Sequence, residues 1–192
     1  MTTRDIRLSQ AAGNGSGVGT STLARLVFWE PCVSPHMSAF IGAVARALPA
    51  TALGRIEKAI KKAETEHRGE IRVAVEAALE SGALLSGQSS RSRALEVFSL
   101  LRVWDTEENN GVLIYLLLAD RAAEIVVDRG IHAQVQAAEW RQICRRMEGA
   151  FSKGEFEHGI VSGIEEVSRV LARHFPPRPG DRNELPDKPA VL

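Results

Sequence analysis

The sequence predicts an α/β protein, a three-layer α/β/α sandwich in which helices flank a small mixed β-sheet. Residues 70–76 alternate apolar and polar side chains, as a half-buried strand does, and residues 112–118 are a continuous apolar run typical of a strand covered on both faces. Segments with the spacing of amphipathic helices occur before, between and after these two strands. The 192 residues, 44% of them hydrophobic, suffice for one core, so we expect one domain with two extensions.

The first predicted helix and strand occupy the start of this domain. Pro49 and Thr51 provide a break and a helix cap, and the apolar face that follows recurs every three or four residues: Leu53, Ile56, Ile60 and Ala63. The strand at 70–76 then directs its β-branched side chains to one side: Ile71, Val73 and Val75.

A second helix separates this strand from the central one. Apolar residues between Ala94 and Trp104 recur at helical spacing, and the run at 112–118 follows. A right-handed crossover through that helix would make the two strands parallel. The short link to a third strand at 124–127 favours an antiparallel hairpin.

Two further helices close the domain. One has its apolar stripe between Trp140 and Phe151, the other between Ile160 and Leu171, and residues 153–156 form the turn between them.

The two extensions differ from the domain in composition. We expect residues 1–49 to form a flexible or partly helical N-terminal extension. Met37 is a candidate for an alternative start of translation. Five of the eight prolines fall within residues 176–192, which predicts a disordered proline-rich tail after a domain of residues 50–175.

Composition also argues against several classes of protein. The 24 basic residues balance the 24 acidic ones, which removes the broad positive field of a nucleic-acid-binding protein. Cys32 and Cys144 form no disulfide framework, and the longest apolar run, 112–119, is too short to span a bilayer as a helix. Without a recognisable signal peptide we expect a cytoplasmic protein, with a peripheral position on the membrane left open.

Acidic and amide side chains gather where the central strand begins. An antiparallel hairpin would bring the end of the third strand back beside that loop, and carboxylate and amide oxygens are the ligands that Ca²⁺ and Mg²⁺ prefer. The candidate metal ligands are Asp105, Glu108, Asn109, Asn110 and Asp128. The alternative interpretation is a solvated acidic turn.

The opposite end of the sheet holds a second candidate site. Glu76 and Asp120 follow the first and central strands, and open α/β sheets usually bind ligands at the carboxyl ends of their parallel strands. Beside the first site, Arg129 and His132 are candidate charge or phosphate partners.

Several blocks of this sequence, in this order, resemble the TPM domain family. The blocks are Gly69–Ile71, Trp104–Ile114, Ala119–Arg121, Asp128–Ile131 and Phe151–Phe156 with Gly159. The resemblance covers about residues 53 to 175 and implies an α/β/α sandwich, divalent-cation binding in some members and acid phosphatase activity in a few. Many bacterial members are exported or membrane-anchored.

This chain departs from the family pattern in two places. The common Asp-Asn-Gly is Asn109-Asn110-Gly111, which removes an anionic ligand, and Asp128 stands where many relatives have glycine, which adds one.

Two functions are therefore expected. The first is an accessory interaction module that acts on an unidentified protein or membrane partner and binds a divalent cation. The alternative is a weak metal-dependent acid phosphatase, in which Arg129 would neutralise developing charge. Its catalytic residues are not assigned, and His132 would serve as base only if its turn directs it inward.

Overall fold

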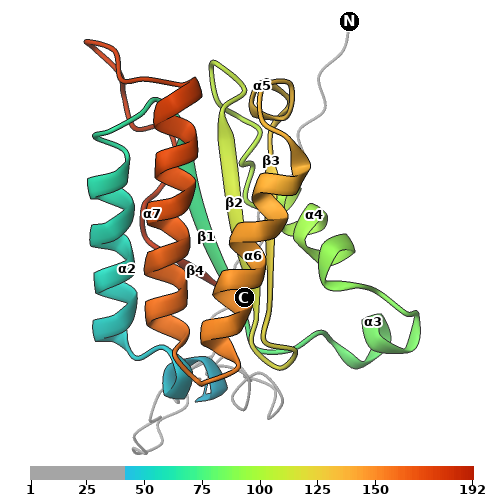
Figure 1. Cartoon of the computed structure of the whole chain (residues 1–192). Coiled ribbons are helices and arrows are strands. Elements are labelled where there is room, and N and C mark those ends of the chain that lie inside the picture. Colours follow the sequence, from blue (N-terminus) through green and yellow to red (C-terminus); the bar gives the residue numbers. More distant parts are fainter. Residues whose placement is uncertain (1–41) are drawn as a thin grey trace, which may run out of the picture. The chain divides into compact units, whose positions relative to one another are not determined.

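The computed structural model describes residues 42–192 and contains a four-stranded mixed sheet in the order β3-β2-β1-β4 (Figure 1). The strands are β1 (Glu70–Glu76), β2 (Gly111–Leu117), β3 (Ala122–Val127) and β4 (Ala190–Val191). β1 pairs parallel with β2, and β2 pairs antiparallel with β3. The predicted parallel pairing and the predicted hairpin are both confirmed.

Helices cover both faces of the sheet, which confirms the predicted three-layer architecture. The helices are α2 (Ala50–Ala63), α3 (Ser81–Leu85), α4 (Ser90–Leu100), α5 (Arg129–His132), α6 (Ala137–Phe151) and α7 (Phe156–His174). α2, α6 and α7 lie on one face, and α4 lies on the other (Figure 1).

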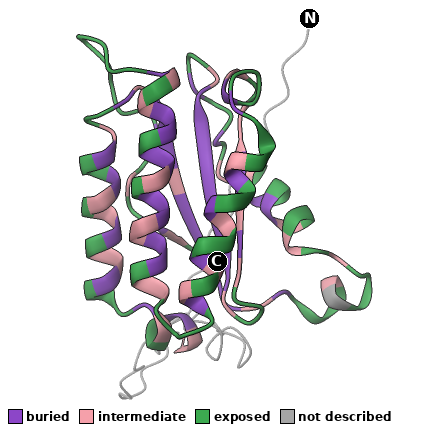
Figure 2. Ribbon diagram, in the orientation of Figure 1, coloured by how far each residue is buried: buried purple, intermediate pink, exposed green. Residues whose placement is uncertain are grey.

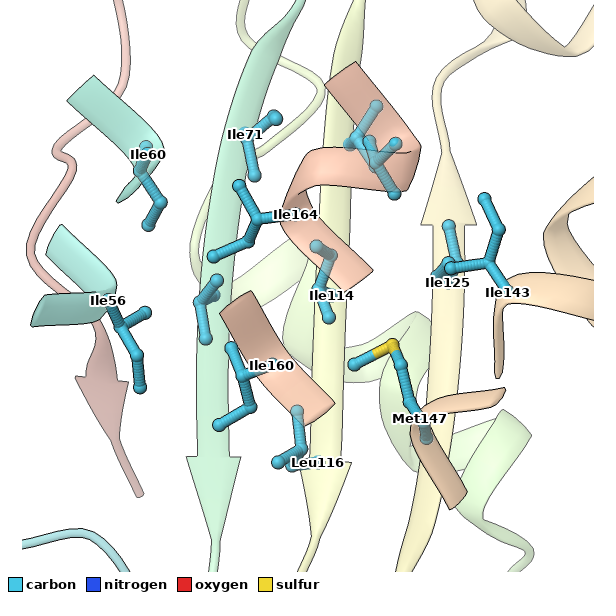
Figure 3. Close-up of a cluster of buried hydrophobic side chains, with 14 of the residues drawn as sticks. Ile56, Ile60, Ile71, Ile114, Leu116, Ile125, Ile143, Met147, Ile160 and Ile164 are labelled. Carbon is cyan, nitrogen blue, oxygen red and sulfur yellow. The ribbon is translucent and has the colours of Figure 1, made fainter. Parts of the chain in front are cut away.

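The larger core lies between the sheet and the α2, α6 and α7 layer. Ile71, Val73 and Val75 of β1 point to this side, as predicted, and are completely buried. Ile56 and Ile164 pack over them from the helices (Figure 3). β2 is buried along its whole length, which explains why its sequence is uninterrupted by polar residues (Figure 2).

The helix α4 is shorter than predicted. It ends at Leu100, and Trp104 lies outside the helix with 46% of its surface exposed. Arg102 adopts a left-handed φ of 54°, and the Val103 amide donates to the Phe98 carbonyl in a Schellman motif. Arginine, rather than glycine, occupies the left-handed position, so the sequence carries no stop signal there.

The prediction of a disordered tail is wrong, because the C-terminal segment completes the sheet. Ala190 and Val191 pair parallel with β1, and the Leu192 amide donates to the Val75 carbonyl at 3.0 Å. Leu185 is buried in the smaller core. The prolines do not prevent this pairing, because an edge strand needs only one of its sides for hydrogen bonds.

The predicted domain boundary at residue 50 is also too late. Val44 and Leu48 are buried in the larger core, so Pro49 separates two parts of the domain. The other predictions for the N-terminal extension, including the start at Met37, fall on residues outside those described. Within residues 42–192, no helix is both long enough and apolar enough to cross a bilayer.

Candidate functional site

The loop before β2 and the end of β3 meet at one end of the sheet. The Asp128 amide donates to the Gly111 carbonyl at 2.9 Å, and the Gly130 amide donates to the Asn109 carbonyl at 3.1 Å. The antiparallel pairing of β2 and β3 continues into these contacts, which explains why residues about 20 positions apart lie together. We call residues 108–110 with residues 128–130 the loop pole.

Two side-chain oxygens of the loop pole are buried and have no hydrogen-bond partner within the described part of the chain. They are Asn110 Oδ1 and Asp128 Oδ2. Both side chains are held in place, since Asn110 Nδ2 donates to the Arg68 carbonyl and Asp128 Oδ1 accepts the Arg129 amide at 2.7 Å as the cap of α5. Buried acceptors without partners are rare in native proteins, so these two oxygens make the loop pole the first candidate for a binding site.

Backbone carbonyls crowd the same place. A Cβ atom at Gly130 would lie 2.6 Å from the Asn109 carbonyl oxygen and 2.8 Å from that of Glu108. Asn109 itself has a left-handed φ of 53°, a conformation that asparagine tolerates better than most residues. The turn therefore brings carbonyl oxygens towards the start of α5, and only glycine fits at position 130.

The other predicted ligands are engaged elsewhere. Glu108 pairs with Arg68 and with Arg178, whose Nη1 lies 2.9 Å from Oε1. Asp105 is exposed and pairs with Arg102 at 3.0 Å.

The two predicted charge partners lie on α5. Arg129 Nε donates to Asn109 Oδ1 at 2.8 Å, and His132 is exposed. Within residues 42–192, no cluster of three or more His, Cys, Asp or Glu side chains is placed to hold a metal. The loop pole thus offers one unpartnered carboxylate oxygen, one unpartnered amide oxygen and backbone carbonyls.

The second candidate site is a buried network at the opposite end of the sheet. Glu76 accepts hydrogen bonds from Tyr115 Oη at 2.6 Å and from Arg93 Nε and Nη2 at 2.9 and 3.0 Å. Asp120 is exposed in the turn between β2 and β3 and takes no part in these bonds. The hydrogen bond with Glu76 raises the pKa of Arg93, while burial raises that of Tyr115. Neither partner of Glu76 is predicted from the sequence.

The Tyr115 hydroxyl stabilises this network, so Tyr115→Phe should lower the free energy of unfolding by about 1 to 2 kcal/mol. The exposed Ser99→Ala serves as control and should change it by less than about 0.5 kcal/mol. Urea unfolding of the two variants measures both values. Equal stability of Tyr115→Phe and the wild type would mean that the hydroxyl contributes nothing.

A buried acidic group under the C-terminal segment was also missed. Burial raises the pKa of Glu64 to about 8 and that of Glu70 to about 7, and it lowers the pKa of His67 to about 4. Glu64 accepts the Ile71 amide, and Glu70 accepts the Leu185 amide, each at 3.2 Å. The contact of Glu70 could not be predicted because it depends on the ordered tail.

A family profile matches most of the described domain. The TPM domain profile covers residues 44–170. The chain belongs to the TPM domain family. Its fold agrees with that of the BA42 protein from the psychrophilic bacterium Bizionia argentinensis, with 34% sequence identity and a TM-score of 0.66 over 76% of this chain and 95% of that one.

A second solved structure shares the fold of this TPM domain. The N-terminal domain of a protein from P. gingivalis is 20% identical, with a TM-score of 0.55 over 68% of this chain and 80% of that one. No curated protein sequence matches. The comparisons thus confirm the family predicted from the sequence blocks.

Proposed function

We propose that this TPM domain is an accessory interaction module that binds a divalent cation, Ca²⁺ or Mg²⁺, at the loop pole. The observation that carries the proposal is the pair of buried, unpartnered oxygens, Asn110 Oδ1 and Asp128 Oδ2. An unpaired buried polar group costs about 1 to 3 kcal/mol, and a cation held by oxygen ligands would remove that cost.

The donor set favours a hard cation of modest affinity. Asp128 supplies a carboxylate and Asn110 an amide oxygen, while Glu108 and Asn109 supply carbonyl oxygens near the start of α5. With a single free carboxylate, we expect a dissociation constant of about 10⁻⁴ to 10⁻³ M, the weak end of the range of calcium sites in proteins.

Cation binding would also bear on the C-terminal segment. Glu108, at the edge of the loop pole, pairs with Arg68 of the domain body and with Arg178 of that segment. An ion that holds the loop in place would therefore also stabilise the contact of residues 176–192 with the domain. Through this segment we expect cation binding to affect a partner protein.

The acid phosphatase alternative would use the same cation to polarise a phosphate ester. One observation favours it, since Arg129 is bonded to Asn109 Oδ1 and thus lies at the loop pole, where it could meet a phosphate. The exposed His132 is its remaining candidate base. The accessory role requires only cation binding, whereas the phosphatase also requires a base and a group that activates water.

Asp128→Asn tests the site with little disturbance of the fold, because asparagine also caps helices well. We expect this variant to bind Ca²⁺ at least about tenfold more weakly than the wild type in calorimetric titrations, since the only unpaired carboxylate of the site is lost. Asp105→Asn, which alters an exposed ion pair outside the site, should bind as the wild type does.

Two results would contradict these proposals. Equal affinities of the wild type and Asp128→Asn would exclude the loop pole as the binding site. Turnover of phosphate esters that requires the cation and is lost in Asp128→Asn would replace the accessory role with the phosphatase.

A further inference from the structure

The outer face of the α3–α4 layer carries apolar side chains without a partner. In the described part of the chain, three of the five exposed large hydrophobic residues belong to these two helices: Leu85, Leu95 and Leu100. Leu85 is 89% exposed and Leu100 is 64% exposed. A helix that only covers a sheet carries polar residues outward, so these leucines indicate a surface that is covered in use.

α4 contacts the smaller core through Ala94, Val97 and Phe98, and Leu101 packs there just after the helix. Ala94 and Val97 are its buried residues, and they pack against β2 and β3. Leu95 and Leu100 are exposed and line a shallow hollow of about 730 Å³. α4 therefore leaves part of its apolar surface uncovered on the outside.

An acidic cavity adjoins this hollow. It measures about 820 Å³ and lies between the loop after α3 and the first turn of α4, with Ser92, Arg93 and Glu96 common to both depressions. Three carboxylates line it against one guanidinium: Glu76, Glu80 and Glu96 against Arg93. Arg93 is already bonded to Glu76 and Glu96, so the cavity has an excess of negative charge.

Glu80 supplies the free charge of the cavity. It is exposed and has no ion-pair or hydrogen-bond partner among residues 42–192. Glu96 is only partly neutralised, since it accepts from Gln88 Nε2 at 2.6 Å and from Arg93 Nη1 at 3.1 Å. A positively charged group that donates several hydrogen bonds would complement both carboxylates.

We propose that the α3–α4 face docks an amphipathic helix of a partner protein that carries a lysine or arginine beside leucines. The basic side chain enters the acidic cavity, and the apolar side chains rest on Leu95 and Leu100. An anionic membrane surface would be repelled by Glu80 and Glu96, which is why we assign the face to a protein. The proposal rests on the interaction role proposed above and does not involve the cation.

Binding of a defined probe tests this proposal. The probe is a labelled synthetic helical peptide with leucines on one face and one lysine beside them, and its control carries glutamate in place of that lysine. Fluorescence anisotropy with the full chain in cation-free buffer should show binding of the lysine peptide that is at least about threefold tighter than that of the control. Equal binding of the two peptides would overturn the charge argument.

Two variants locate the peptide on the protein. Glu80→Gln combined with Glu96→Gln should weaken binding at least about threefold, and so should Leu95→Ser combined with Leu100→Ser, whereas Glu165→Gln on the exposed surface of α7 should not. If the variant with two serines does not fold, the result for the variant with two glutamines is sufficient to test the docking surface.

Other outcomes would overturn the docking surface. No binding of the lysine peptide, or binding that neither variant weakens, excludes the α3–α4 face. Stronger binding to anionic phospholipid vesicles than to the peptide, lost in the leucine variant, would assign the face to a membrane. Because the cation site is tested by Asp128→Asn in separate titrations, failure of either proposal leaves the other measurable.

Discussion

Gly111→Ala is expected to lower the free energy of unfolding by about 3 kcal/mol, the largest effect of any exchange considered for this domain. A Cβ atom at position 111 would lie 2.0 Å from the Val103 carbonyl oxygen and 3.0 Å from Val103 Cγ1. Val103 cannot move away easily, because it is fully buried and its amide closes the C-terminus of α4. The glycine after Asn110 is thus required by close packing.

The control for this exchange is Gly149→Ala. A Cβ atom at position 149, in α6, would meet nothing within 4 Å, so alanine should raise stability by about 0.5 to 1 kcal/mol through its higher helix propensity. Chemical denaturation measures both variants. A Gly111→Ala protein within 1 kcal/mol of the wild type, about the scatter of ordinary exchanges, would show that β2 does not approach Val103 so closely.

Between pH 6.5 and 8.5 the stability of the wild type is expected to fall by about 2 to 3 kcal/mol. The folded protein holds protons on Glu64 and Glu70, with pKa values of about 8 and about 7, that the unfolded chain releases near the ordinary value of 4.5. The contribution of these two groups to the free energy of unfolding is therefore largest at low pH. It is lost as the pH rises through about 7 and about 8. His67 acts in the opposite sense, but only below its ordinary pKa of 6.5.

A variant with glutamine at both positions separates this effect from other titrations. Glu64→Gln combined with Glu70→Gln should lose at most about half as much stability over the same interval, because glutamine does not ionise. Glu57→Gln is the matched control, since its pair with Lys61 lowers the pKa of Glu57 and leaves it ionised throughout. Parallel stability curves for the wild type and the double variant would exclude Glu64 and Glu70 as the source.

The sequence was sufficient to predict the layers and the pairing of β1, β2 and β3. Each of these elements has a pattern that depends on burial alone, such as the alternation along β1 and the uninterrupted apolar run of β2. The last strand could not be predicted in the same way. β4 has two residues and is held by contacts of Arg72 and Val75 that no local pattern records.

The candidate site was predictable in position and not in detail. The hairpin brings Asp128 next to the loop before β2, as the sequence indicates. Whether a carboxylate is free depends on long-range partners, and the arginines that occupy Glu108 come from positions 68 and 178. For the same reason Glu76 appeared to be an open acidic group, although Arg93 and Tyr115 surround it.

The most direct test of cation binding is a Ca²⁺ and Mg²⁺ titration of the full chain, followed residue by residue through amide NMR shifts. We expect saturable shifts confined to residues 108–111 and 128–132, at concentrations of about 10⁻⁴ to 10⁻³ M. The amides of the α3–α4 layer should not respond, which separates the loop pole from the docking surface. Shifts centred on Glu64 and Glu70, or none at about 10⁻² M cation, would contradict a cation site at the loop pole.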